Sequence, residues 1–332
     1  MRALTVISPG TWELQDREDR EPSPQSLRIA PRVVGICGTD LDIIDGTIDP
    51  AFVRYPIVIG HEWAGTVVVG NAEIPSGSRV VVEGVIACGI CAECLTGDTN
   101  RCVLYDEYGF TRDGAAADYV DATADLVHVL ADHVSWDSAV LTEPAAVVLR
   151  ALQRAAPASG GEALVIGDGT VALLAAVLLR QWSPSRVVML GARDDQRALA
   201  LKAGVDVFTT DPDSVGNNFS IVVEAAGAIA ATATAFASCA RGGRIVLIGY
   251  PGHGKTFPLP VDDVINNDLN ILGSFSYTRS AWADVVALLN SGAADFSFLV
   301  THHYPLADCE EALGTLRNPS GPRGKVVLEM TS

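Results

Sequence analysis

The chain has 332 residues, of which 48% are hydrophobic and 19% charged, and its formal net charge at pH 7 is −17. This length exceeds what one hydrophobic core usually supports, so we expect two folded domains rather than a disordered or fibrous chain. So much negative charge excludes nucleic acid and anionic membrane surfaces as expected partners, and we attribute most of it to solubility.

The N-terminal segment and the cysteines indicate a protein that stays in a reducing cytoplasm. Residues 1–7 are typical of a first strand and lack the long apolar core and small-residue cleavage site of a signal peptide. The most apolar stretch, Val171–Leu179, is too short to span a bilayer. Four of the seven cysteines lie close enough together to be metal ligands rather than disulfide partners.

The first part of the chain predicts a mostly β region, and the middle part predicts an α/β domain. Short alternating runs such as Leu27–Ile29 and Val80–Val82 lie between clusters of Gly, Pro, Asp and Asn. From residue 144, apolar runs alternate with helical patterns, which indicates a parallel, doubly wound sheet. The strands and helices expected there are Ala163–Ile166, Val171–Gln181, Arg186–Leu190, Gln196–Ala203, Ile221–Val223 and Arg244–Ile248.

From about residue 277 the pattern changes again, to a helix at Trp282–Asn290 and then short strands ending in Lys325–Leu328. We therefore expect the α/β domain, residues 144–276, to be inserted between two parts of one catalytic domain, residues 1–143 and 277–332.

A four-cysteine lobe, residues 84–106, predicts a structural zinc site. Its cysteines have the spacing C-x2-C-x2-C-x7-C, and four thiolates satisfy the tetrahedral preference of zinc with no position left open for chemistry. An iron–sulfur cluster and paired disulfides are the alternatives, and neither the spacing nor the compartment favours them. The ligands would be Cys88, Cys91, Cys94 and Cys102.

A second set of residues, scattered along the chain, predicts a catalytic metal. Cys37, His61-Glu62 and Glu143 are individually weak signals, because a lone cysteine or histidine is more often a core residue. Together they offer a thiolate, an imidazole and carboxylates, which are the ligand types of catalytic zinc sites that keep one position open for water or substrate.

A glycine-rich turn follows the strand at residues 163–166 and predicts a dinucleotide site. Gly167 permits the turn, Gly169 lets the backbone approach a pyrophosphate, and the helix that starts at Thr170-Val171 supplies N–H donors. Ala172 replaces the third glycine of the motif, an accepted change where helix and strand pack closely. Ala225 and Gly249 follow later strands of the same sheet and are further candidates for cofactor contacts.

Over its whole length the chain resembles the zinc-dependent medium-chain dehydrogenase/reductase family of the alcohol dehydrogenase superfamily. The motifs that carry the resemblance include the four-cysteine lobe, the glycine-rich turn and Glu143-Pro144; the others are Gly35-Ile36-Cys37-Gly38-Thr39-Asp40 and Gly60-His61-Glu62 with Gly65. The resemblance implies a GroES-like, mostly β catalytic domain plus a Rossmann nucleotide-binding domain.

Within that family the sequence is most similar to the polyol, sugar and cyclitol branch. Glu143 stands where simple alcohol dehydrogenases carry a cysteine ligand, and residues 38–40 and 109–114 also suit the branch. The second of these stretches is similar to one in dehydrogenases that oxidise amino-cyclitols. The resemblance implies oxidation of a secondary hydroxyl to a ketone with a nicotinamide cofactor, and a homodimer or homotetramer. A zinc-dependent dehydrogenase of simple alcohols or aldehydes, a zinc-free reductase and a non-catalytic nucleotide sensor are the alternatives.

The resemblance also implies roles for single residues. Cys37 and His61 would be direct zinc ligands, and either Glu62 or Glu143 would be the third. Asp40 would accept a hydrogen bond from the other ring nitrogen of His61 and fix its tautomer. Thr39 would take the proton from the substrate hydroxyl.

Two positions leave alternatives open. Many relatives have a histidine at Asp42 that ends the proton relay, so Asp42 is either a carboxylate relay or a solvated loop residue. The strand at residues 186–190 is followed by Gly191-Ala192-Arg193, with no acid at its tip to bond a ribose hydroxyl. Arg193 could pair with a 2′-phosphate, so we expect NADP, with use of both cofactors as the fallback, unless Asp194 or Asp195 restores NAD selectivity.

Substrate specificity is not readable from the sequence, since the pocket side chains lie on separate loops. Aromatic and aliphatic residues that would line the pocket or else belong to the core are Trp12, Ile43, Tyr55, Trp63, Phe110 and Tyr277.

Overall fold

The computed structural model describes residues 1–19, 21–252 and 254–330, which form two compact units. The first unit comprises Met1–Glu143, Tyr277–Ser320 and Lys325–Ser332, and the second comprises Pro144–Ser276 and Gly321–Gly324. The helix α4 (Thr142–Ala155) carries the chain from the first unit into the second. The short segment Gly321–Gly324, which we expected in the catalytic domain, groups with the second unit.

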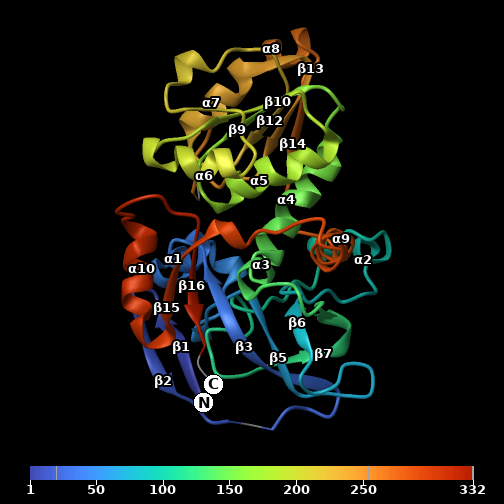
Figure 1. The fold of residues 1–332 in the computed structure, drawn as a ribbon, viewed down its shortest axis with the longest axis vertical. Coiled ribbons are helices and arrows are strands. Elements are labelled where there is room, and N and C mark those ends of the chain that lie inside the picture. Colours follow the sequence, from blue (N-terminus) through green and yellow to red (C-terminus); the bar gives the residue numbers. More distant parts are fainter. Residues whose placement is uncertain (20, 253, 331–332) are drawn as a thin grey trace. The chain divides into compact units, whose positions relative to one another are not determined.

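The first unit is built mainly from β-strands, in a seven-stranded and a three-stranded sheet (Figure 1). The larger sheet has the order β15-β16-β3-β5-β6-β8, with β7 also paired to β3, and the smaller has the order β2-β1-β4. Except for the parallel pair β15–β16, the pairings are antiparallel. The strands are β1 (Arg2–Ser8), β2 (Thr11–Asp16), β3 (Ser26–Ile36), β4 (Ile57–Val58), β5 (Glu62–Val69), β6 (Arg79–Val82), β7 (Val120–Thr123), β8 (Val127–Val129), β15 (Val300–Pro305) and β16 (Lys325–Glu329).

Runs of consecutive buried side chains in the central strands form the core of this unit. In β1, residues 3–6 are buried and the strand ends are exposed, while Ile29 of β3 and Trp63 of β5 lie among the fully buried side chains. The helices of this unit are α1 (Gly38–Asp45), α2 (Ala92–Leu95), α3 (Trp136–Ala139), α9 (Arg279–Asn290) and α10 (Cys309–Arg317).

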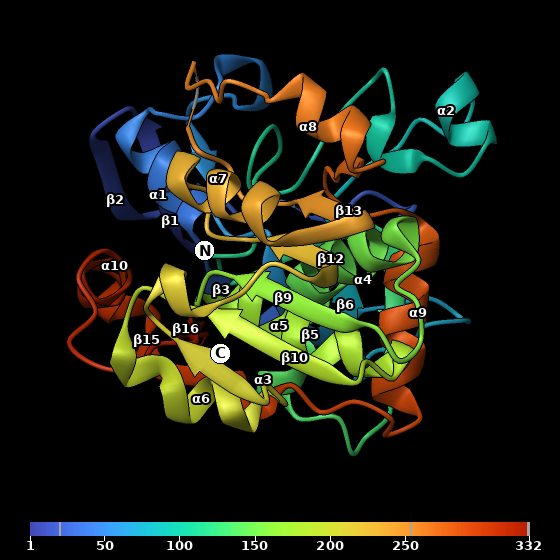
Figure 2. The ribbon, with the colours of Figure 1, turned by 90° about the horizontal axis from the view of Figure 1, so that it is seen from above.

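The second unit is a six-stranded parallel sheet with helices on both faces (Figures 1 and 2). Its order, β11-β10-β9-β12-β13-β14, is that of a doubly wound dinucleotide-binding sheet. Both faces are covered, so its central strands are nearly continuous apolar runs. The strands are β9 (Glu162–Ile166), β10 (Arg186–Leu190), β11 (Val207–Thr209), β12 (Phe219–Glu224), β13 (Cys239–Leu247) and β14 (Asn270–Gly273).

The helices of the second unit also follow the predicted pattern. Besides α4, they are α5 (Thr170–Leu179), α6 (Arg197–Lys202), α7 (Ile229–Ser238) and α8 (Val261–Asn266). The predicted parallel, doubly wound sheet is therefore confirmed. The boundaries of α5 and α6 differ from the predicted helices by a few residues, whereas α7, α8, β11 and β14 were not among the predicted segments. Within the described part of the chain, the length and hydropathy of each helix fall short of what a membrane crossing requires.

Candidate functional site

The predicted metal ligands of the first unit meet because three neighbouring strands bring their ends together. In the antiparallel register, Gly35 near the end of β3 lies opposite Glu62 at the start of β5. On the other side of β3, Ile36 pairs with Val326 near the start of β16. Cys37 follows β3 directly and His61 precedes β5, so these two residues, distant in sequence, lie at one end of the sheet.

The cysteine of this cluster is also the N-cap of α1. The Sγ atom of Cys37 accepts a hydrogen bond from the backbone N–H of Thr39 at 3.2 Å. In return, the Asp40 carboxylate accepts from the backbone N–H of Cys37 at 2.9 Å, which completes a capping box. The sequence Cys37-Gly38-Thr39-Asp40 therefore fixes the positions of both the thiol and the buried carboxylate through local backbone geometry.

His61 lies between these two groups. Its Nε2 is 3.2 Å from Cys37 Sγ, and its Nδ1 is 3.4 Å from Oδ1 of Asp40. Burial disfavours the charged imidazole, but Cys37 and Asp40 outweigh it and raise the pKa of His61 well above its usual value. Burial likewise opposes ionisation of Asp40, yet His61 and the Cys37 N–H lower the pKa of that carboxyl group. Asp40 therefore lies beside Nδ1 of His61 at ion-pair distance, but the hydrogen bond that the resemblance implies is not formed, because this Nδ1 has no hydrogen-bond partner among the described residues.

Glu62 is held by a residue that the sequence did not single out. Its carboxylate forms an ion pair with Lys325, the first residue of β16, and both side chains are 3% exposed. Gly35 leaves the space for this carboxylate, because a Cβ atom at that position would come within 2.5 Å of Glu62 Oε2. The Lys325 Nζ atom also lies 3.5 Å from the carbonyl oxygen of Ile36, so β3, β5 and β16 are joined at the site.

Two further buried carboxyl groups lie near the cluster. Burial raises the pKa of Glu143, in the first turn of α4, to about 7, while His61 opposes the shift and Glu62 adds to it. Burial raises the pKa of Glu107 to about 8, again with His61 opposing. Glu107 was not predicted. Its only sequence signal is its place two residues before the motif Gly109–Gly114. The backbone carbonyl oxygen of Glu107 accepts hydrogen bonds from the N–H groups of residues 110, 111 and 112 and so fixes the start of that motif.

The relay residues differ in their surroundings. Thr39 is half-buried beside Cys37, where its N–H is engaged with the thiol. Asp42 is exposed, and its carboxylate accepts a hydrogen bond from the Thr47 hydroxyl at 2.7 Å. Of the two interpretations of Asp42, the solvated residue agrees better with this contact, although Asp42 lies in α1 and not in a loop.

The donor set suits a zinc ion. One ligand atom from each of Cys37, His61 and Glu62 lies within 4.8 Å of the others, and this mixture of soft thiolate, imidazole and carboxylate is typical of catalytic zinc. Acidic groups outnumber the cations around it, since Asp40, Glu143 and the Cys37 thiol share the site with Lys325 and His61. A divalent cation would offset that excess of negative charge. Glu143 is not in this compact group and lies at a longer distance.

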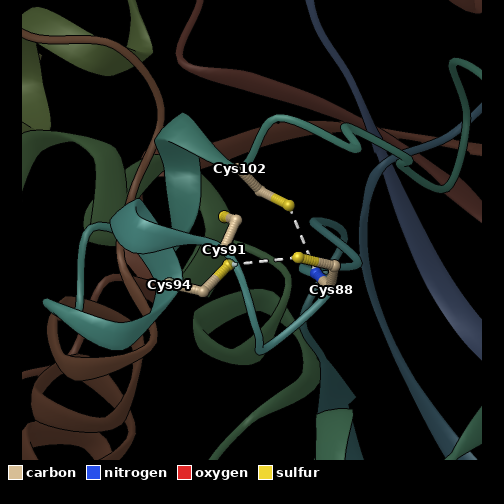
Figure 3. A group of neighbouring side chains, drawn as sticks. All are labelled: Cys88, Cys91, Cys94 and Cys102. Atoms are coloured by element: carbon tan, nitrogen blue, oxygen red, sulfur yellow. Dashed lines mark hydrogen bonds between the residues drawn. The ribbon is translucent and has the colours of Figure 1, made fainter.

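The four-cysteine lobe forms the second cluster with metal-ligand geometry (Figure 3). Cys91 caps α2, Cys88 Sγ is 3.9 Å from Cys94 Sγ, and the Cys88 N–H donates to Cys102 Sγ at 3.2 Å. All seven cysteines are free thiols in this structure. Backbone N–H groups of Val103 and Cys94 lower the pKa of Cys91 to about 6, as expected for a thiolate ready to bind a metal.

Most of the candidate pocket residues belong to the hydrophobic core, and one lies beside the metal cluster. Trp63, Ile43 and Tyr277 are fully buried, and the Tyr277 hydroxyl accepts hydrogen bonds from the backbone N–H groups of residues 84 and 85. Tyr55 donates to the Ile43 carbonyl, and Trp12 packs on the edge of the core. Phe110 differs, because its ring centroid lies 4.9 Å from that of His61.

The glycine-rich turn of the second unit has the shape that a dinucleotide requires. Gly167 has a φ of +121°, and a Cβ there would crowd the backbone of Ala225, at the end of β12. At Gly169 a Cβ would meet nothing within 4 Å, so open space faces the turn. Gly169 is the N-cap of α5 without a side-chain cap, which leaves N–H groups of the first turn, residues 170–172, for an anion. Gly249 follows β13 at the same strand ends.

The tip of β10 differs from the predicted open turn. The Asp168 carboxylate accepts hydrogen bonds from the backbone N–H groups of Ala192 and Arg193, and its Oδ1 is 3.0 Å from Nη2 of Arg193. We expected NADP because the turn after β10 has no acid at its tip. The structure corrects this point, because Asp168 of the glycine turn places a carboxylate there. Asp194 does not take that role, because it is exposed and paired with Arg197.

Comparisons with known proteins agree with these two units. Residues 23–132 match the family model of the alcohol dehydrogenase GroES-like domain, and residues 169–291 match that of the zinc-binding dehydrogenases. The chain is 31% identical to an L-threonine 3-dehydrogenase of Saccharopolyspora erythraea, over 100% of this chain and 99% of the relative. It is 28% identical to a sorbitol dehydrogenase of Halalkalibacterium halodurans, with 99% of each covered.

Among solved structures, a thermostable alcohol dehydrogenase from Pyrobaculum aerophilum superimposes with a TM-score of 0.90 at 27% identity, covering 99% of each chain. The similarity therefore extends over both units and not over one shared domain. The chain belongs to the zinc-dependent medium-chain dehydrogenase/reductase family, with a GroES-like domain and a Rossmann domain.

Proposed function

We propose that this protein oxidises a secondary hydroxyl group of a polyol, sugar or amino-cyclitol to a ketone with a nicotinamide cofactor. The observation that carries the proposal is the buried cluster of Cys37, His61 and Glu62, with the additional carboxyl group of Glu143 beside it. The sorbitol dehydrogenases among the relatives act, by their names, on a polyol, which agrees with this substrate class.

The residues of the cluster would hold the catalytic zinc. Cys37 and His61 are direct ligands in this proposal, and Glu62 or Glu143 is the third. Glu62 reaches the compact group but is paired with Lys325, whereas Glu143 lies farther away without such a partner in the described structure. When bound, zinc polarises the substrate oxygen as a Lewis acid and the nicotinamide accepts a hydride.

The neighbouring residues orient the ligands and move the proton. Asp40 faces Nδ1 of His61, so the ring presents Nε2 toward Cys37 and the metal position. Thr39, in the first turn of α1 beside the thiol, accepts the proton from the substrate hydroxyl and passes it outward. The half-buried position of Thr39 allows that transfer to end in solvent.

The carboxyl groups around the cluster favour a substrate with several hydroxyls. Vicinal hydroxyls can donate hydrogen bonds to Glu143 and Glu107 and so gain an orientation that a simple alcohol lacks. L-threonine is the second candidate, because of the 31% identity to L-threonine 3-dehydrogenases. A carboxylate substrate needs a cation, however, and Lys325 beside the cluster is already paired with Glu62. This favours the neutral polyol.

The four-cysteine lobe would hold a second, structural zinc that takes no part in the reaction. We also propose a homodimer or homotetramer in the cytoplasm. Free thiols agree with a reducing compartment, and exposed apolar side chains on the lobe agree with subunit contacts. These side chains are Ile90, Leu95, Val103 and Leu104. Light scattering coupled to gel filtration measures the subunit number, and a monomer would contradict the proposal.

The function is tested by a substrate panel. Purified protein with measured zinc content is given polyols, aldoses, inositol derivatives, L-threonine and simple primary alcohols, each with NAD and with NADP, and formation of reduced cofactor is followed. We expect the highest kcat/KM for a polyol, sugar or cyclitol. A higher value for primary alcohols than for every polyol would favour the simple alcohol dehydrogenase, and turnover without zinc would favour the zinc-free reductase. No turnover despite cofactor binding would favour the nucleotide sensor.

A further inference from the structure

The tip of β10 lacks an acidic residue because a side chain there has no space. A Cβ atom on Gly191 would lie 2.5 Å from Cζ of Phe208, on β11, and 3.1 Å from Cβ of Asp168. Doubly wound sheets that select NAD normally place an Asp or Glu at this strand end, where it bonds the ribose hydroxyls. Here the aromatic ring and the Asp168 side chain fill the position instead.

Asp168 brings a carboxylate to the same strand end from the neighbouring turn. Its Oδ2 accepts from the N–H groups of Ala192 at 2.8 Å and Arg193 at 2.9 Å, and its Oδ1 accepts from Nη2 of Arg193 at 3.0 Å. The side chain is 10% exposed. Three donors fix the ionised group, and a carboxylate has about four acceptor sites, so one remains for a ribose hydroxyl.

The turn that carries Asp168 is itself held in place. The Gln196 side chain donates to the carbonyl oxygens of both Asp168 and Arg323, and it accepts from the Arg323 backbone N–H. Gln196 is fully buried, so this contact joins the glycine turn, the loop after β10 and the segment Gly321–Gly324 into one structure. The carboxylate position is therefore set by the fold.

We infer that Asp168 is the ribose-recognising acid of this chain and that it selects NAD over NADP. The inference rests on the proposed function, which requires a dinucleotide. It adds the residue that discriminates between NAD and NADP. A 2′-phosphate at this strand end would meet the negative charge of Asp168. It would also have to compete with Asp168 for the Arg193 guanidinium, which the sequence alone assigned to the phosphate.

The same contacts imply a latent phosphate site. Arg193 is paired with the Asp168 carboxylate, and Arg323 lies within electrostatic reach of it: burial and Arg193 lower the pKa of Arg323, whereas Asp168 raises it. Nη1 of Arg193 is buried and has no hydrogen-bond partner among the described residues. Removing the charge of Asp168 takes the carboxylate from the Arg193 guanidinium, whose planar donors can then bind a phosphate.

The test measures binding of two cofactor fragments, ADP-ribose and its 2′-phosphate, by isothermal titration calorimetry. Neither fragment contains the nicotinamide, so the result does not depend on turnover or on zinc. The parent is compared with Asp168→Asn, which keeps the shape and an acceptor oxygen, and with Asp168→Ala in case the amide disturbs the turn. The double variant Asp168→Asn/Arg193→Ala tests the arginine, and Asp194→Asn, an exposed charge paired with Arg197, is the matched control.

We expect the parent and the control to bind ADP-ribose at least about tenfold more tightly than its 2′-phosphate. Both Asp168 variants should reduce that ratio by about tenfold or more, chiefly by tighter binding of the phosphate form, and the double variant should lose this gain. A parent that prefers the 2′-phosphate, or a ratio unchanged in both Asp168 variants, would overturn the inference while leaving the proposed oxidation intact. Failure of the parent to bind either fragment would overturn the proposed function, and the inference with it.

Discussion

Replacing Glu107 by glutamine should flatten the pH dependence of stability of the zinc-free protein. Burial raises the pKa of this carboxyl group from 4.5 to about 8 in the folded state. The folded protein therefore keeps a proton that the unfolded chain releases. The contribution of Glu107 to the free energy of unfolding is thus fully present below about pH 4.5 and is lost as the pH rises toward 8. Since one pKa unit corresponds to about 1.4 kcal/mol, the loss from Glu107 between about pH 5 and pH 8 is about 3 kcal/mol.

Urea unfolding of chelator-treated protein at a series of pH values measures this loss directly. Zinc must be removed, because a bound cation stabilises ionised carboxylates nearby. The parent should lose about 3 kcal/mol more than Glu107→Gln over this range, and the two should converge at low pH. The exposed Glu73→Gln is the control and should follow the parent. Parallel profiles for the parent and Glu107→Gln would refute the argument that folding raises the pKa of Glu107.

Three further substitutions test separate parts of the account. Cys94→Ser should lose one zinc per chain and lower the melting temperature, because a closed thiolate site supports folding; unchanged zinc content and melting would contradict the structural site. His61→Ala should abolish turnover but keep binding of ADP-ribose, whose contacts lie in the other unit; persisting activity would show that the metal centre is elsewhere. Lys325→Met should destabilise the zinc-free protein by about 3 to 5 kcal/mol in urea, because it leaves the Glu62 carboxylate buried without its partner. A loss below about 1 kcal/mol would mean that water or another donor replaces Lys325.

The residues of the two candidate metal clusters could be predicted because their signals are local and their residue types are rare. Cys37 comes with the Gly-Thr-Asp that forms its capping box, and the four cysteines of the lobe follow one another within a short loop. The parallel sheet could be predicted for a similar reason, since alternating apolar and helical runs reflect burial on both of its faces.

The residues that sequence reasoning missed act over long sequence separations. Lys325 reaches Glu62 only because β16 pairs with β3, and a lysine at the start of a strand is usually an exposed residue. Burial raises the pKa of Glu107, and the sequence around this glutamate does not show that it is buried. In the sequence, Gly191 at the end of β10 suggests room for a phosphate. In the structure, the ring of Phe208 from β11 fills the space beside this glycine, and Asp168 supplies the acid.

The central claim is that Cys37, His61 and Glu62 hold a zinc ion separate from that of the four-cysteine lobe. Anomalous diffraction at the zinc edge, from crystals of protein purified without added metal, locates such ions directly. The account predicts two peaks per chain, one among the Sγ and nitrogen atoms of Cys37 and His61 and one within the lobe. A single peak in the lobe, with no density between Cys37 and His61, would contradict it.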